Sequence, residues 1–213
     1  MTNGLFLVLE GIDGSGTSTQ AELLKQYWQD HGGHAVISPE PSAGPIGVLL
    51  RQVLKDRVRM CEAPDQFNEQ LAYLFAADRH DHLYNPIDGV NKLVQDGFLV
   101  ISTRYYFSSL AYNCRNPEEF AFVQALNQRF PAPDLTCYVD IPVTVSMARL
   151  QSRSHREIYE HPEKLTQVRQ NYQNIFQNFD GLWQQIDGCQ TPEQVFTQIL
   201  ALIRQHYPHC LNW

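Results

Sequence analysis

The feature that most restricts the fold is a glycine-rich stretch near the N-terminus. Residues 11–18 read GIDGSGTS and directly follow the apolar run LFLVLE at residues 5–10. A short, continuously apolar run is typical of a strand buried on both faces of a parallel sheet. After the glycines, apolar residues recur at helical spacing until Gly32 and Gly33 end the pattern. The sequence therefore begins with a predicted strand, a tight turn and a helix.

The alternation of strand and helix patterns extends along the whole chain. Further strands are predicted at residues 34–38, 97–102, 135–141 and, at a sheet edge, 182–187. Helices are predicted at residues 46–57, 66–83, 86–96, 143–151, 162–179 and 192–206. This order is typical of a doubly wound parallel sheet, and no repeat or long linker interrupts it. We expect a single α/β domain that spans residues 1–213.

The spacing of the glycines matches the phosphate-binding pattern G-x-x-x-x-G-K-[ST], except that Thr17 stands at the lysine position. Gly11, Gly14 and Gly16 allow the backbone to turn its N–H groups toward an anion, and the following helix adds its positive N-terminal end. The hydroxyl of Ser18 is suited to Mg²⁺. The pattern predicts a three-layer P-loop NTPase fold, with a central parallel sheet of about five strands flanked by helices. A tight turn that binds no ligand is the alternative for the glycines alone.

Composition narrows the possible partners. The net charge of −7 and the pI near 5.5 argue against a nonspecific nucleic-acid binder, which needs a basic surface. The five cysteines are odd in number and lack CxxC spacing, so we interpret them as free thiols in a reducing compartment. No signal peptide and no apolar run long enough for a membrane is recognisable. We expect a cytoplasmic protein with neither a nucleic-acid nor a membrane partner.

Four further stretches resemble one kinase family when they are taken together with LEGIDGSGTSTQ. They are EPSAGPIGVLLR at 40–51, LFAADRHDH at 74–82, TRYYFSSLAYN at 103–113 and PDLTCYVD at 133–140. Their order and spacing are similar to those of thymidylate kinase, and the resemblance covers about residues 5 to 200. It implies transfer of the γ-phosphoryl group of MgATP to dTMP, which gives dTDP and ADP in dTTP biosynthesis. It also implies a homodimer.

The resemblance implies a residue set for the acceptor nucleotide. Phe75 would stack on thymine, and Arg79 would donate to the base edge. The monophosphate would be held by arginines, and the sugar by a carboxylate and an aromatic ring, with a serine nearby: Arg51, Arg104, Asp13, Tyr112 and Ser109. Taken singly, Phe75 could be a core residue, Arg79 a surface ion pair, Asp13 a turn residue, and Ser108 and Ser109 helix caps.

A second set is implied for ATP and for catalysis. The ATP-binding residues are Gly11, Ile12, Asp13, Gly14, Ser15, Gly16, Thr17, Ser18, Thr19 and Arg149, with Ser18 as the metal ligand. The catalytic residues are Arg104, Arg153, Arg156 and Thr17. The arginine-bearing segment 151–164 is the candidate for a lid, at approximately residues 151–161, which would exclude water when it closes. A solvated charged loop is the alternative for any single arginine there.

Two positions depart from the family pattern. Thr17 replaces the loop lysine, and Thr103 replaces the aspartate that precedes Arg104. One positive and one negative charge are thus removed from one small site, which favours coupled replacement. We expect an active thymidylate kinase in which Arg153 or Arg156 replaces the lysine. The alternatives are a kinase for another (deoxy)nucleoside monophosphate and a catalytically silent nucleotide-binding homologue.

Overall fold

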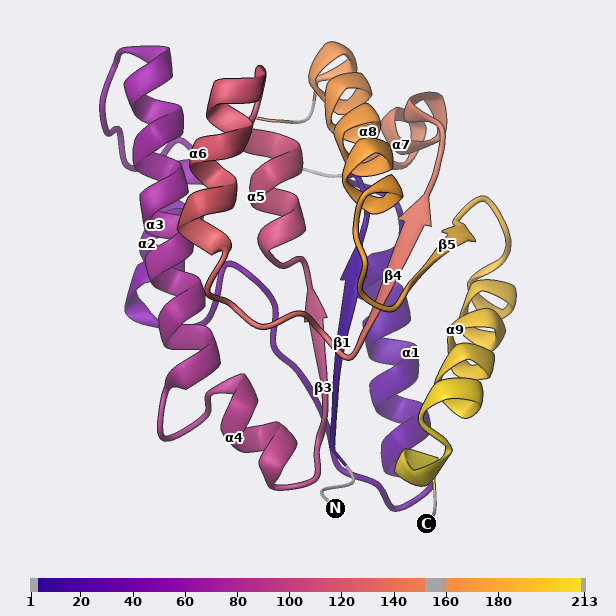
Figure 1. The fold of residues 1–213 in the computed structure, drawn as a ribbon. Helices are drawn as coiled ribbons and strands as arrows, with labels where there is room; N and C mark the ends of the chain where they lie inside the picture. The colour runs from indigo at the N-terminus through magenta and orange to yellow at the C-terminus, as the bar shows by residue number, and fades with distance from the viewer. Residues whose placement is uncertain (1–3, 152–158, 160, 212–213) are drawn as a thin grey trace.

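The computed structural model describes residues 4–151, 159 and 161–211. Its centre is a five-stranded sheet in the order β2-β3-β1-β4-β5, in which every neighbouring pair is parallel (Figure 1). The strands are β1 (Leu5–Glu10), β2 (Ala35–Ile37), β3 (Leu99–Thr103), β4 (Leu135–Asp140) and β5 (Trp183–Asp187). The predicted parallel sheet is confirmed, with the glycine-rich stretch directly after its central strand.

Helices cover both faces of the sheet. They are α1 (Thr17–Asp30), α2 (Pro45–Leu54), α3 (Pro64–Tyr84), α4 (Val90–Gln95), α5 (Tyr106–Asn113), α6 (Pro117–Asn127), α7 (Val143–Leu150), α8 (Pro162–Gln177) and α9 (Pro192–His206), with a short 3₁₀ helix at Pro208–Leu211. The central strand β1 supplies side chains to both faces. Leu7 packs in the cluster formed with α1 and α9, and Val8 packs in the cluster formed with α3, α4, α5 and α8. This explains why residues 5–9 are apolar without alternation.

Two helices between β3 and β4 lie outside the elements predicted from the sequence. Helix α5 is only eight residues long, and six of its residues are buried. A helix buried on most sides shows no amphipathic repeat, so periodicity does not reveal it. Helix α6 begins with Asn116, whose side chain accepts a hydrogen bond from the Glu119 N–H group, and Pro117 follows at the first helical position.

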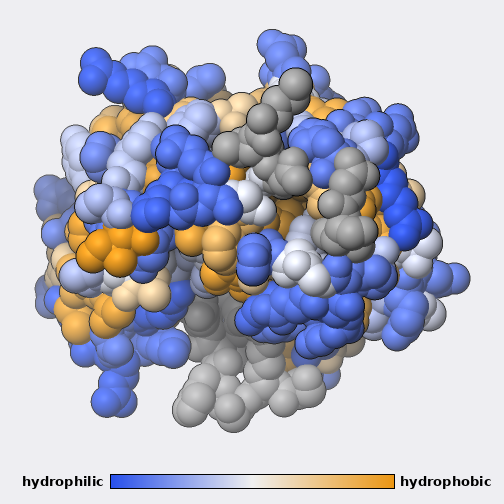
Figure 2. Space-filling view, turned by 90° about the horizontal axis from the view of Figure 1, so that it is seen from below, coloured by the Kyte–Doolittle hydropathy of each residue, from blue (hydrophilic) through white to orange (hydrophobic). Residues whose placement is uncertain are grey.

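The five strands point the same way, so their carboxyl ends form one edge of the sheet, and the chain ends described in the structure lie at the opposite end (Figure 1). In the view from that opposite end, hydrophobic residues form small groups separated by hydrophilic ones (Figure 2). No helix among the described residues is long and apolar enough to cross a membrane. In parallel α/β sheets, ligands bind at the carboxyl edge.

Candidate active site

The glycine-rich loop leads directly from β1 into α1. Gly14 and Gly16 have φ angles of 79° and 102°, a region that favours glycine. Gly16 is the N-cap of α1 and has no side chain to occupy the first amides of that helix. Gly11 serves packing, because a Cβ atom there would lie 2.5 Å from Ser15 Oγ and 2.6 Å from the Val139 carbonyl oxygen. The loop is therefore shaped to present backbone N–H groups to an anion.

A cavity of about 630 Å³ lies over this loop at the carboxyl edge of the sheet. It brings together residues that are far apart in the sequence and that the sequence predicted to form a site. These lining residues are Ile12, Asp13, Gly14, Ser15, Gly16, Thr17, Ser18, Thr19, Arg51, Phe75, Arg79, Thr103, Arg104, Ser109, Tyr112 and Arg149. Gly11 does not line the cavity. Arg153 and Arg156 lie outside the described residues.

Arg104 is the centre of a charged network that joins the end of β3 to the glycine-rich loop. Its Nη2 donates to Asp13 Oδ1 at 2.5 Å and to the Tyr112 hydroxyl at 3.1 Å. The Tyr112 hydroxyl donates to Asp13 Oδ2 at 2.9 Å, and its ring lies 4.7 Å from the Arg104 Cζ atom. Burial raises the pKa of Tyr112 well above its usual value of 10.0, so this hydroxyl keeps its proton. The three side chains hold one another in the cavity.

The backbone of Arg104 is strained. Its φ angle is 87°, which places a residue other than glycine in the left-handed region, at a cost on the order of 1–2 kcal/mol. The Arg104 N–H group donates to the Leu9 carbonyl oxygen at 3.0 Å, and Ser102 Oγ donates to the Arg104 carbonyl oxygen at 2.7 Å. These two hydrogen bonds hold the strained backbone conformation of Arg104. The fold therefore fixes the direction of its guanidinium.

Glu10, the last residue of β1, is a functional candidate that the sequence reasoning missed. Its side chain is fully buried and accepts hydrogen bonds from the Tyr105 N–H group at 2.7 Å, from Ser108 Oγ at 2.8 Å and from the Tyr172 hydroxyl at 2.8 Å. Burial raises the pKa of its carboxyl to about 7. A carboxylate at the end of an apolar run is the signal that could have identified it.

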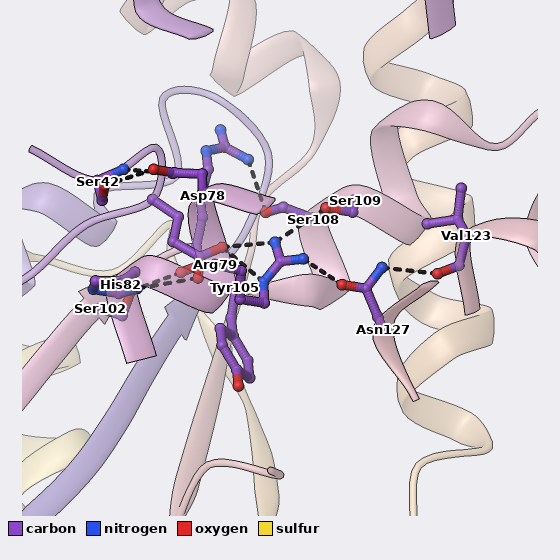
Figure 3. Close-up of polar contacts among 12 residues, drawn as sticks. Ser42, Asp78, Arg79, His82, Ser102, Tyr105, Ser108, Ser109, Val123 and Asn127 are labelled. Atoms are coloured by element: carbon purple, nitrogen blue, oxygen red, sulfur yellow. Dashed lines mark hydrogen bonds and ion pairs between the residues drawn. The ribbon is translucent and has the colours of Figure 1, made fainter. Parts of the chain in front are cut away.

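Arg79 forms a buried network rather than a surface ion pair (Figure 3). Its Nε and Nη2 donate to Glu40 Oε2 at 2.9 and 2.6 Å, Nη2 also donates to Ser109 Oγ at 3.1 Å, and Nη1 donates to Asn127 Oδ1. The ring of Tyr105 lies 5.4 Å from the Arg79 Cζ atom. A guanidinium has five N–H groups. Four have partners among the described residues, which leaves one Nη1 hydrogen for a ligand.

The loop after β2 is held against α2 and α3. Arg51 donates to the carbonyl oxygens of Pro41 and Ser42, and it lines the cavity. Asp78 accepts from the Ser42 N–H group at 2.7 Å and from Ser42 Oγ at 2.6 Å (Figure 3). Arg51 therefore lies at the cavity wall on a loop that other side chains fix in place.

The sequence allowed Phe75 to be either a core residue or a residue that contacts a ligand, and its position in the structure is compatible with both. It is half-buried and packs against a cluster that contains Leu50 and Leu71, and it also lines the cavity. A half-buried aromatic ring at a cavity wall can contact a planar ligand and has little conformational freedom to lose on binding.

Ser109 and Ser108 do not cap α5. No side chain caps this helix, and the two hydroxyls instead bind Arg79 and Glu10, respectively. Asn113, the last residue of α5, was also missed: it lines the cavity, and its buried Nδ2 has no partner among the described residues. A buried amide without a partner is uncommon. It marks a position where a ligand acceptor or an ordered water completes the site.

On the other side of the loop, Arg149 ties the end of α7 to the glycines. Its Nη1 donates to the Gly14 carbonyl oxygen and its Nη2 to the Gly188 carbonyl oxygen, each at 3.0 Å. Thr17 and Ser18, the first two residues of α1, line the cavity beside them, and Ser18 is exposed. This half of the cavity has the backbone amides and hydroxyls that suit a phosphate chain.

The residues present fit a magnesium ion that is carried mainly by phosphates. Among residues 4–151, 159 and 161–211, no group of three or more histidine, cysteine or acidic side chains could hold a metal. Mg²⁺ at phosphate sites needs only one or two protein oxygens, because substrate phosphates and waters complete its shell. The exposed Ser18 hydroxyl at the start of α1 is of that kind.

A parallel sheet in this order, with a glycine-rich loop after the central strand and a helix N-terminus at a cavity, defines a P-loop nucleotide-binding protein. The thymidylate kinase family model matches residues 9–199. The chain is 36% identical over 207 residues to a putative thymidylate kinase of Treponema pallidum, covering 94% of this chain and 95% of the relative. It is 35% identical over 206 residues to a probable thymidylate kinase of Thermococcus kodakarensis, covering 93% and 97%. The chain belongs to the thymidylate kinase family.

The architecture agrees with a solved structure. Thymidylate kinase from Candida albicans superposes with a TM-score of 0.77 at 23% sequence identity, covering 97% of this chain and 93% of the other. At this identity the superposition establishes the fold. The kinase fold expected from the sequence is confirmed by the observed sheet and by this likeness.

Proposed function

We propose that this protein is an active thymidylate kinase, which transfers the γ-phosphoryl group of MgATP to dTMP and releases dTDP and ADP, a step of dTTP biosynthesis. The observation that carries the proposal is the direct pair between Arg104 and Asp13. It joins the acceptor-side arginine to the glycine-rich loop, so both nucleotides would meet in one cavity.

The acceptor lies on the side of α2, α3 and α5. Arg104 and Arg51 hold its phosphate, since guanidinium groups match phosphate oxygens in pairs. Phe75 stacks on the base, and Arg79 donates its remaining Nη1 hydrogen to the base edge. Tyr112 packs against the sugar at C2′, and Asp13 receives the 3′-hydroxyl. The burial of Arg79 among its partners supports this assignment, because a fixed donor selects one orientation of a base.

The donor lies on the glycine-rich loop. The amides of residues 14–18 surround its phosphates, and Ser18 holds Mg²⁺, which when bound neutralises charge on the phosphate oxygens. The acceptor phosphate is already an anion at neutral pH, so positioning and charge stabilisation carry the reaction without a strong base. Arg153 or Arg156, in a lid at approximately residues 151–161, supplies the cation that Thr17 lacks.

The protein is further proposed to act in the cytoplasm as a single domain over residues 1–213 and as a homodimer. Family analogy supports the dimer. All five cysteines are free thiols in the structure, which agrees with a reducing compartment. ATP and dTMP are its small-molecule partners.

The test is direct detection of products from dTMP, ATP and Mg²⁺. Ser18→Ala and Arg104→Ala variants, purified in parallel, control for contaminating kinases. Turnover that both variants abolish supports the proposal. If turnover is absent while dTMP binding is measurable by calorimetry, the two threonines have silenced the chemistry, and the second candidate, a nucleotide-binding homologue, is correct. Competition among dTMP, dUMP, dGMP and UMP identifies the preferred acceptor.

A further inference from the structure

We infer that Glu10 is a positioning residue for the acceptor phosphate, which acts by fixing the direction of Arg104. The inference rests on the proposed function, because it assigns the acceptor phosphate to Arg104. Glu10 does not line the cavity itself, but two of its hydrogen-bond partners, Tyr105 and Ser108, do. Its effect passes through the turn between β3 and α5.

Glu10 contacts the turn itself and the first residues of α5. Its Oε1 accepts from the N–H group of Tyr105, the residue that follows the left-handed Arg104. Its Oε2 accepts from Ser108 Oγ, and Ser108 Oγ in turn accepts from Arg104 Nη1 at 3.3 Å. The carboxylate therefore holds the backbone just after the strained residue and, through one hydroxyl, the guanidinium itself. Figure 3 labels Tyr105, the residue before α5, and Ser108, which lies in α5.

The Glu10 carboxylate is not explained by a contribution to folding stability. Glu10 has no exposed surface, and moving an ionised carboxyl into such a site costs several kcal/mol. An apolar or amide side chain would relieve that cost. The carboxylate is instead linked to Arg104 through Ser108 Oγ, and the aspartate that precedes this arginine in the family pattern is here Thr103. Glu10 thus supplies a carboxylate from β1, the strand that pairs with β3.

A Glu10→Gln variant can separate the two contacts of the Glu10 carboxylate, one with the Tyr105 backbone and one with the Ser108 hydroxyl. In Glu10→Gln, Oε1 can still accept from Tyr105, but the amide nitrogen that replaces Oε2 cannot accept from the hydroxyls of Ser108 and Tyr172. Both hydroxyls must then reorient, which disturbs the bond from Arg104 Nη1 to Ser108 Oγ. Arg104 then keeps its Nη2 contacts with Asp13 and Tyr112 but loses the Nη1 contact with Ser108. A variant at Tyr172 is the matched control. Tyr172→Phe removes the 2.8 Å hydrogen bonds of its hydroxyl to Glu10 and to Ser108 Oγ, but leaves Tyr105 N–H and Ser108 Oγ in contact with the carboxylate.

The experiment measures binding of dTMP and of thymidine by calorimetry, because thymidine lacks the phosphate. In Glu10→Gln we expect dTMP to bind about 10- to 100-fold more weakly, the range of one hydrogen bond to a charged group, while thymidine binding stays unchanged. Tyr172→Phe should retain the wild-type preference for dTMP. The double variant Glu10→Gln with Arg104→Ala should bind dTMP no more weakly than Arg104→Ala alone.

Each outcome is decisive. If Glu10→Gln weakens dTMP and thymidine equally, its role is structural and the inference is wrong. If Arg104→Ala reduces the preference for dTMP and Glu10→Gln does not, the inference is wrong although the proposed function stands. If the wild-type protein binds the two ligands equally, Arg104 does not hold the acceptor phosphate, and the assignment in the proposed function fails together with the inference.

Discussion

Replacement of Glu40 by glutamine should destabilise the protein severely, because it leaves a buried arginine without its counter-charge. The Arg79 guanidinium and the Glu40 carboxylate lie 2.6 Å apart, and their side chains are only 1% and 2% exposed. Water cannot replace the lost charge in such a site. The Glu40→Gln side chain keeps the shape and one carbonyl acceptor, so the change isolates the charge from the volume.

The expected size follows from the burial. Breaking a buried ion pair by removing one partner costs about 3–5 kcal/mol, which is a large part of the 5–15 kcal/mol that stabilises a typical domain. For a chain of this size, each kcal/mol lowers the melting temperature by roughly 2–4 °C. We therefore expect the melting temperature of Glu40→Gln to fall by about 6–20 °C.

Urea denaturation of wild type, Glu40→Gln and Asp96→Asn supplies the assay. The control, Asp96→Asn, also replaces a carboxylate by an amide, but in an exposed ion pair. Lys92 and Asp96 lie 2.5 Å apart, and their side chains are 45% and 48% exposed. Surface pairs of this type contribute about 0.2–1 kcal/mol. A Glu40→Gln variant as stable as Asp96→Asn would refute the argument that burial, rather than distance, determines the contribution of a charge pair.

Three further outcomes are expected. Thr17→Lys alone should raise turnover little, whereas Thr17→Lys with Thr103→Asp should be non-additive in kcat; strictly additive rates would exclude coupled replacement. Tyr112→Ala should raise the kcat/KM for the ribose form of dTMP relative to dTMP by about tenfold; an unchanged ratio would remove Tyr112 from sugar selection. The free energy of unfolding should fall by up to about 3 kcal/mol as pH rises from 4.5 to about 7, because folding raises the pKa of Glu10 and the folded state binds the extra proton there. Glu10→Gln should flatten this slope in urea titrations, and an unaltered slope would contradict the buried position of the charge.

The sequence predicted the elements that have strong local signals. The loop at residues 11–18 was recognisable because glycine spacing reflects backbone angles, and the strands around it because a buried parallel strand must be apolar on both faces. Residues far apart, such as Arg51 and Tyr112, were assigned to one site only through the family resemblance. Nothing in their local sequence indicates that both line one cavity.

What the sequence did not predict depends on tertiary contacts. Helix α5 was missed because it is enclosed by α3, α6 and α8, so its buried residues show no single apolar face. The burial of Arg79 was missed because its partners, Glu40 and Asn127, are 39 and 48 positions away. Polar networks of this kind depend on the geometry of several elements at once, and no spacing rule describes them.

The pair between Asp13 and Arg104 bears on which anions the cavity accepts. In the proposed function, a phosphate that binds Arg104 must compete with the Asp13 carboxylate, which already pairs with the guanidinium and repels the phosphate. Inorganic phosphate has only its oxygens to offset that repulsion, whereas the acceptor nucleotide of the proposed function would also contact Phe75 and Arg79 with its base. We therefore expect the Asp13 carboxylate to weaken the binding of free phosphate at Arg104 more than the binding of a nucleotide.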